Sequence, residues 1–258
     1  MRINHNMMAL NTHRQLGVNA TNTSKAMEKL SSGLRINRAA DDAAGLSISE
    51  KMRGQIRAME QATRNSQDGI SLIQTAEGAL TEVSDMLVRI KELYTQNANG
   101  TYNSTDQANI AAEIAALTAE IVNIGANTKF NGINLLNGSL DIKIQINETS
   151  NDTLAIKMSS AVNATNIAAS GLDTVTSNID VISTIRSTFG ALQNRLEHTV
   201  NNLSTTTENL TAAESRIRDT DMAKEMMTFT KNNILNQAAQ AMLAQANQNP
   251  QGVLQLLR

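Results

Sequence analysis

Cysteine and tryptophan are absent from this sequence of 258 residues, and proline occurs once, at Pro250. Without cysteine the chain forms no disulfide, binds no metal through thiolates and has no cysteine nucleophile. An average proline usage of about 5% would give roughly 13 prolines, so little in this chain interrupts a helix. The aromatic residues make up only 2% of the chain, fewer than a globular core of this size normally uses.

Charge is also scarce and nearly balanced. The chain has 22 Lys and Arg against 24 Asp and Glu, which gives a net charge of −2. That balance provides no electrostatic attraction for nucleic acid or for an anionic membrane. Charged residues make up 18% of the chain, against a typical value of about 25%. So few charges on a long helical protein indicate surface that is reserved for other subunits.

The N-terminal segment lacks the apolar stretch and the small-residue cleavage site of a secretory signal peptide. The sequence also lacks a stretch of about 18 or more consecutive apolar residues, which a membrane-spanning helix requires. We therefore expect no membrane insertion. If the protein is exported, we expect a route that does not use a cleaved signal.

Apolar residues recur every three or four positions in the N-terminal half, the pattern of amphipathic helices. The first such segment is followed by a break within 34–50, and the second predicted helix covers 44–98. Ser104 is expected to cap a third helix over 105–128, with Gln107 completing a capping box. The short connection between the second and third helices predicts an antiparallel hairpin. The second helix carries heptad spacing at Leu80, Val83, Leu87, Ile90 and Tyr94.

The only convincing β signal lies within about 129–160. Two Asn-Gly pairs, at 131–132 and 137–138, favour two-residue hairpin turns. Apolar and polar residues then alternate from Leu140 to Ile146, and again from Leu154 to Met158 after a polar turn. This period of two predicts a β-hairpin.

Helix is predicted to resume near Val175, where apolar residues follow heptad spacing over five heptads, a length specific for a coiled coil. From Asn232 to Leu257 the sequence has no charged side chain. Both ends of the chain are thus amphipathic and poor in charge, and neither buries its apolar stripe alone. The methionines gather mainly near these ends, and methionine suits adaptable interfaces.

We predict that the two ends pair, so that the chain is mainly α: an elongated antiparallel coiled-coil rod with a small β-hairpin region. Residues 1–34 together with 220–258 would form a terminal coiled-coil segment. Residues 35–219 would form a helical rod domain that includes the hairpin.

Motifs of the common enzyme classes are missing, because the sequence has no HExxH, GxGxxG, GxxxxGK[ST] or GxSxG. His5 and His13 lie eight residues apart with no nearby carboxylate, which does not favour a metal site. We predict no enzymatic activity, no metal site and no cofactor.

The acidic pair Asp41 and Asp42 suits a polar connection or a helix cap better than a cation site, because no third ligand follows at a suitable spacing. Arg35 and Arg38 flank the same turn. Two interpretations stay open for these arginines: a salt bridge to one of the two carboxylates, or a contact with another subunit.

Several long strings are characteristic of one protein family. They are MRINHN (1–6), LSSGLRINRAADDAAGLSISEKMR (30–53), QATRNSQDGISLIQTAEGAL (61–80), TKFNGINLLNG (128–138), ESRIRDTDMAKEM (214–226) and NQNPQGVLQLLR (247–258). With these strings in both halves the chain resembles bacterial flagellin, the subunit of the flagellar filament. Flagellins often carry large outer domains between the two helical halves. Only the short stretch around 140–175 occupies that place here, so the resemblance is to a minimal flagellin.

The resemblance implies a structural subunit that polymerises into the helical propeller for swimming. It further implies export of the unfolded chain by the flagellar type III apparatus and addition beneath a cap at the extracellular filament tip. An export chaperone would bind the C-terminal segment, 220–258, and cap and hook-junction proteins would be further partners. A hook–filament junction protein of the same apparatus is the alternative function.

Contacts between subunits are expected along the terminal helices and the turn that follows the first of them. The residues assigned to these contacts are Leu16, Met27, Leu30, Leu34, Arg35, Ile234, Leu235, Met242, Leu254 and Leu257.

The resemblance also implies recognition of the helical hairpin by a vertebrate Toll-like receptor, through Arg89, Leu93 and Glu113. Arg89 and Leu93 are four residues apart, so they are expected to share one helix face, and Glu113 lies on the returning helix. Val88 and Leu117 depart from the glutamine and arginine common in the family at these positions, which predicts weakened recognition. A contact between protofilaments is the alternative role for this surface.

Overall fold

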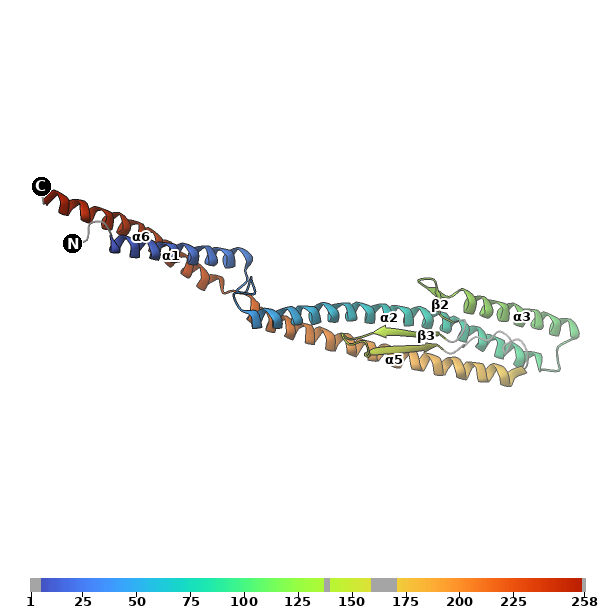
Figure 1. The fold of residues 1–258 in the computed structure, drawn as a ribbon. Helices are drawn as coiled ribbons and strands as arrows, with labels where there is room; N and C mark the ends of the chain where they lie inside the picture. Colours follow the sequence, from blue (N-terminus) through green and yellow to red (C-terminus); the bar gives the residue numbers. More distant parts are fainter. Residues whose placement is uncertain (1–5, 137–139, 159–170, 257–258) are drawn as a thin grey trace. The chain divides into compact units, whose positions relative to one another are not determined.

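The computed structural model describes residues 6–136, 140–158 and 171–256. They fold into long helices and two small antiparallel strand pairs, as Figure 1 shows, which confirms the mainly α prediction. The chain forms two compact units. We call residues 1–54 with 209–258 the terminal unit, and residues 55–208 the central unit.

In the terminal unit, α1 (Met7–Ser32) packs along α6 (Met222–Leu256), which confirms the predicted pairing of the two ends (Figure 1). The Asn6 amide donates to the Ala246 carbonyl oxygen over 2.7 Å, and the Asn236 amide donates to Thr23 Oγ1 over 2.9 Å. These contacts join the start of α1 to the later part of α6, so the two helices are antiparallel. Ala26 is the buried residue of α1.

Each end of α1 has a defined cap. The Asn6 side chain accepts a hydrogen bond from the Ala9 N–H over 3.1 Å and begins the helix. Gly33 ends the helix in the left-handed region with φ 72°, a conformation that costs glycine little because it has no Cβ. The chain then turns within ten residues and enters α2 (Ala43–Asn97).

The central unit is built on α2, α3 (Ser104–Asn127) and α5 (Gly171–Arg218). The heptad positions of α2 supply its core, since Leu80, Val83, Leu87 and Ile90 are fully buried. Five positions of α5 that recur every seven residues are buried as well: Val175, Ile182, Phe189, Leu196 and Leu203. The predicted helices over 44–98, over 105–128 and from about 175 are thus confirmed.

The start of α3 differs from the prediction. Asn103, not Ser104, is the N-cap, because its side-chain oxygen accepts the Asp106 N–H over 2.8 Å. The backbone N–H of Gln107 bonds to the Asn103 carbonyl instead of taking part in a capping box. Asparagine is at least as good a cap as serine, and it lies one residue earlier.

Both predicted β elements form. β1 (Lys129–Phe130) and β2 (Ile133–Asn134) pair through a two-residue turn whose central residues Asn131 and Gly132 have φ of 49° and 80°. Positive φ at both positions is the signature of a type I′ turn. The pair at 137–138 lies outside the described residues.

The larger hairpin, β3 (Leu140–Gln145) with β4 (Thr153–Met158), follows the predicted alternation. Its buried residues Ile144, Leu154 and Ile156 join the core formed by α2 and α5. Gly69 on α2 permits this packing, since a Cβ there would lie 2.2 Å from the Ile144 Cδ1.

Among the described residues, α3 is the one helix long and apolar enough to satisfy a simple test for a membrane span, with a mean hydropathy of 1.2. Its buried residues Ile110, Thr118 and Ile121 face the central unit. Its carboxylates Asp106, Glu113 and Glu120 recur every seven residues, and this spacing puts them on a common outer face. Packing and charge therefore assign α3 to the folded central unit.

Candidate functional site

Most of the large apolar side chains that the described structure leaves exposed lie on α1 and α6. They are Met7, Met8, Leu10, Val18, Met27, Met222, Met226, Met227, Ile234, Leu235 and Met242. Each helix buries only the face it turns to its partner, so a pair of helices leaves its other faces in water. Exposed apolar surface of this extent is typical of interaction sites.

Four of the predicted assembly residues belong to this exposed set. Met27 is 54% exposed, Ile234 61%, Leu235 40% and Met242 62%. Polar and uncharged neighbours surround those on α6, because the sequence carries no charge from Asn232 onward through the rest of that helix. We call the exposed apolar side chains of α1 and α6 the terminal apolar surface.

The remaining predicted assembly residues are placed differently. Leu16, Leu30 and Leu34 are half-buried within the terminal unit, so they contribute to its own packing. Leu254 belongs to α6. Leu257 lies outside the described residues. Sequence reasoning did not assign Leu10 and Val18, although both are exposed, because they lie off the regular stripe on which it relied.

A polar cluster ties the end of α1 to the end of α5. Leu34 and Asp219 form an isolated antiparallel bridge, and the Arg35 N–H donates to the Arg218 carbonyl over 2.6 Å. The Arg218 side chain is only 13% exposed, and its guanidinium pairs with Glu50 Oε1 at 2.6 Å. This hydrogen bond from Arg218 holds the pKa of the Glu50 carboxyl below its ordinary value.

The guanidinium groups of Arg35 and Arg38 do not pair with Asp41 or Asp42 in the described contacts. Arg38 Nε pairs with Glu28 Oε1 at 2.9 Å, and Arg35 donates to a backbone carbonyl of α5. The carboxylates accept backbone N–H groups instead, from residues 37, 38 and 45. The salt-bridge interpretation of these arginines is therefore wrong, and their contact with another subunit stays a prediction.

On the α2–α3 hairpin, the structure brings Arg89 and Glu113 together. Arg89 Nε and Nη2 donate to Glu113 Oε1 over 3.1 and 3.0 Å, and Nη1 pairs with Glu92 at 3.1 Å. The hydrogen bonds to Glu113 and Glu92 raise the pKa of Arg89. Leu93 is only 1% exposed and belongs to the core. Its side chain is therefore not on the surface that Arg89 and Glu113 present.

The neighbourhood of that ion pair includes a shallow groove of about 510 Å³. Lys91, Thr95 and Tyr102 are among its lining residues, together with the exposed Val88. Leu117, the other position at which the chain departs from the family pattern, is half-buried on α3. The hairpin thus offers an exposed, mixed surface of charged, hydroxyl and apolar groups.

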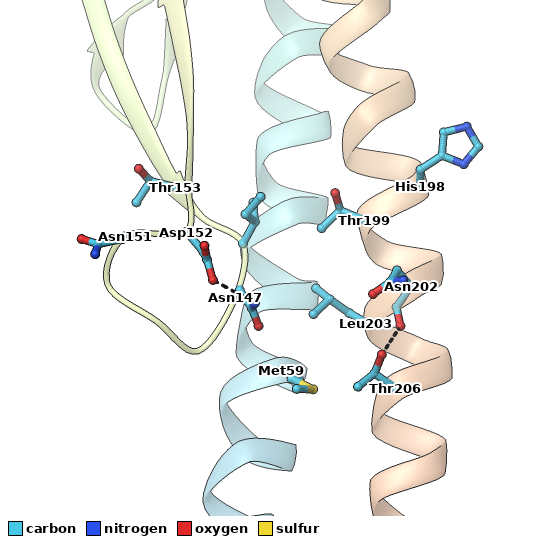
Figure 2. A pocket seen from close by; sticks show the side chains of 11 residues that line it. Met59, Asn147, Asn151, Asp152, Thr153, His198, Thr199, Asn202, Leu203 and Thr206 are labelled. Carbon is cyan, nitrogen blue, oxygen red and sulfur yellow. Dashed lines mark hydrogen bonds between the residues drawn. The ribbon is translucent and has the colours of Figure 1, made fainter.

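A second groove, of about 560 Å³, lies between the β3–β4 turn and α5. Figure 2 shows Asp152 held by Asn147, whose amide donates to it over 2.9 Å, while His198 points away from the turn. The other polar residues of α5 that line this groove are Thr199, Asn202 and Thr206. Among the described residues, no three His, Asp or Glu side chains gather where they could bind a metal ion.

Comparison with known proteins identifies the family. Residues 3–141 match the bacterial flagellin N-terminal helical region, and residues 172–257 match the bacterial flagellin C-terminal helical region. The flagellin of Halalkalibacterium halodurans is 54% identical over 272 residues, and that of Bacillus subtilis 53% identical over 304 residues. The flagellar filament 33 kDa core protein of Treponema phagedenis is 46% identical over 291 residues. All three alignments cover 100% of both chains.

Two solved structures are also similar to this chain. The crystal structure of Bacillus cereus flagellin has 34% identity and a TM-score of 0.50, covering 58% of this chain and 94% of that one. A putative flagellar hook-associated protein from Vibrio parahaemolyticus has a TM-score of 0.60 at 12% identity, covering 69% and 100%, a likeness that concerns the fold alone. With both family regions matched and more than half of its residues identical to full-length relatives, the chain belongs to the bacterial flagellin family.

Proposed function

We propose that this flagellin, a structural subunit of the flagellar filament, joins its neighbours through the terminal apolar surface. The observation that carries the proposal is the concentration of exposed large apolar side chains on α1 and α6. Full burial of one Leu, Ile or Met side chain gains about 1.5–3 kcal/mol. The partner that covers this surface is another copy of the same chain. The flagellin relatives match the whole chain, and a filament subunit contacts many copies of itself.

The absence of charge on the second half of α6 supports the same proposal. A charged side chain in a subunit contact must be paired or its burial is costly, whereas amides can pair with one another. Asn and Gln interrupt the apolar residues of α6 too often for a membrane span. The helix therefore suits burial on several faces among protein neighbours.

A seeded polymerisation assay tests this proposal on the full chain. Short filament fragments are added to purified subunits, and the critical concentration is measured by sedimentation and electron microscopy. Replacing Ile234 and Met242 together by Gln should raise the critical concentration by about tenfold or more, since about 1.4 kcal/mol corresponds to a factor of ten. The thermal midpoint of the free subunit should not change, because both side chains are already more than half exposed.

Val181→Gln is the matched control, because Val181 is 46% exposed but lies on α5 in the central unit. We expect it to change the critical concentration less than the double variant does. Equal effects of the two variants would contradict the assignment to the terminal surface. Short oligomers under every seeding condition would favour a hook–filament junction protein instead.

Family membership supports further proposals about export and partners. We expect the unfolded chain to leave the cell through the flagellar type III apparatus and to be added at the extracellular tip beneath the cap. A chaperone that covers 220–258 would keep the uncharged, apolar α6 from aggregating before export. Flagellins are structural proteins, and we assign no catalytic role to this chain.

Receptor recognition is proposed for Arg89 and Glu113, the exposed and paired residues of the hairpin. Leu93 would then support the site from beneath, by packing that fixes the position of α2 under Arg89. The test is a Toll-like receptor reporter-cell assay with monomeric protein. The Arg89→Ala, Glu113→Ala double variant should lose potency while its thermal midpoint stays near that of the parent. Full potency of the double variant would contradict the assignment.

A further inference from the structure

Methionine is concentrated on the surface of the terminal helices. The chain has 12 methionines, and those of α1 and α6 are all between 48% and 69% exposed. The methionines of α2 are less exposed, since Met59 is buried and Met52 and Met86 are half-buried. Leucine at these exposed positions would offer as much apolar area for burial as methionine does. What distinguishes methionine from leucine is its thioether sulfur.

The antiparallel pairing of α1 and α6 gathers these methionines into two groups. Thr23 contacts Asn236, so the residues after Thr23 on α1 lie near the start of α6. This places Met27 at the same end of the pair as Met222, Met226 and Met227.

Asn6 contacts Ala246 at the other end of the helix pair. This contact places Met7 and Met8 near the part of α6 that carries Met242. We call the two groups together the methionine surface. It makes up more than half of the terminal apolar surface.

We propose that the methionine surface is an oxidation-sensitive site at which peroxide controls entry of the free subunit into the filament. The inference rests on the proposed function, namely assembly through the terminal apolar surface. In the free subunit these sulfur atoms are open to solvent, and in the filament neighbouring copies cover them. The same side chains are thus vulnerable before assembly and protected after it.

The chemistry requires only hydrogen peroxide. A lone pair on the methionine sulfur attacks one peroxide oxygen, the O–O bond breaks, and a sulfur–oxygen bond forms. The proton on the attacked oxygen passes to the other oxygen, which leaves as water. The sulfur is oxidised by two electrons and the peroxide is reduced by two. The product, methionine sulfoxide, is polar and disrupts apolar interfaces.

A sulfoxide in a contact shaped for a thioether has no built hydrogen-bond partner. Burying a polar group that has no hydrogen-bond partner weakens the contact. We expect one such group to raise the critical concentration by about tenfold, which corresponds to about 1.4 kcal/mol. Several sulfoxides at the two ends of the helix pair should abolish assembly at concentrations where the unoxidised subunit polymerises.

The experiment treats the full-length free subunit with hydrogen peroxide, quenches the peroxide, and counts sulfoxides by peptide mass spectrometry. Seeded polymerisation of the treated and untreated protein is then compared. We expect the terminal methionines to oxidise first and the critical concentration to rise by about tenfold or more. Preformed filaments given the same treatment should carry far less sulfoxide at these positions.

Two variants distinguish the effect of oxidising the methionine surface from the effect of oxidation elsewhere in the chain. The first replaces the exposed methionines of α1 and α6 by Leu and should assemble with or without peroxide treatment. The second, with Met52, Met59 and Met86 replaced by Leu, retains the methionine surface and should stay sensitive to peroxide. Since the filament-protection measurement needs no variant, it tests the proposal even if the first variant fails to fold.

Three results would overturn the proposal: oxidised subunits that assemble like untreated ones, a leucine variant as sensitive as the parent, or equal oxidation of these positions in filaments and free subunits. If the untreated parent chain does not assemble on seeds at all, the proposed function itself fails, and this inference fails with it. Normal assembly of the untreated chain together with either of the first two results defeats this inference alone. Equal oxidation in filaments and free subunits would count against the proposed function as well, because the terminal apolar surface would then stay open to solvent after assembly.

Discussion

Asn103 illustrates how a single residue sets the boundary of a helix. Its side-chain oxygen accepts the Asp106 N–H and so satisfies one donor that the first turn of α3 leaves free. Asn103→Ala should lower the free energy of unfolding of the central unit by about 1 kcal/mol. Ser104→Ala, one residue along, should change it by less than about 0.5 kcal/mol. Urea unfolding followed by circular dichroism measures both, and a larger effect of the serine variant would contradict the assigned cap.

The carboxyl groups of the terminal unit make its stability depend on pH. A hydrogen bond from Arg218 lowers the pKa of Glu50, and backbone N–H groups of Arg38 and Asn37 lower the pKa of Asp41. As the pH falls, the unfolded chain takes up these protons before the folded chain does. The stabilisation is therefore complete above the ordinary glutamate pKa of 4.5 and is lost as the pH falls through the lower, folded value.

The variant Glu50→Gln tests this dependence. Its thermal midpoint should lie below that of the parent at neutral pH, because Arg218 loses its charged partner. The difference between the two midpoints should shrink as the solution is acidified below pH 4.5. A difference that stays constant across this pH range would show that the ion pair does not contribute.

Within single elements, two glycines of α2 occupy opposite environments. Gly69 is buried beneath β3, where a Cβ would meet the Ile144 side chain at 2.2 Å, whereas nothing lies within 4 Å of a Cβ at Gly78. Gly69→Ala should destabilise the central unit by about 1–3 kcal/mol, the usual cost of overpacking. Gly78→Ala should stabilise it by about 0.5–1 kcal/mol, because alanine favours helix. Thermal unfolding of both variants measures these changes, and destabilisation by Gly78→Ala would contradict the assigned environment.

Helices and strands were predictable because their periodicity is set by the buried face. The heptad positions of α2 and α5 and the alternating positions of β3 and β4 supply much of the buried core, and others among them, such as Tyr94 and Ile142, are half-buried against it. Asn103 was missed because asparagine and serine both cap helices well, so composition does not decide between adjacent positions. Contacts between elements, such as that of Gly69 with Ile144, depend on packing that no local pattern contains.

Arg89 and Leu93 show the limit of periodicity for a candidate site. Residues four apart on a helix differ by only about 40° in direction, so they were expected to present a common surface. The edge of the buried face passes between them, and Leu93 faces the core while the long Arg89 side chain reaches outward to Glu113. The partners of Arg38 and Asp41 were unpredictable for a similar reason, since each lies in a turn whose backbone path decides which groups meet.

At the scale of the whole molecule, the two units differ in how much of their apolar surface they bury. The central unit encloses a continuous apolar core, whereas the terminal unit pairs two helices and leaves most of its large apolar side chains exposed. A pair of helices with so little enclosed core gains stability when further copies cover it. We therefore propose that the terminal unit completes its packing in the filament.

The absence of cysteine makes the most direct test simple, because a single introduced thiol is the only one in the chain. Ile234→Cys and Met242→Cys place this thiol at positions that are 61% and 62% exposed in the free subunit. The rate of reaction with a soluble thiol reagent is measured for the free subunit and for filaments of the same variant. The account predicts rapid labelling of the free subunit and strong protection in the filament. Equal labelling rates in the two states would contradict it, because the terminal apolar surface would then remain open to solvent after assembly.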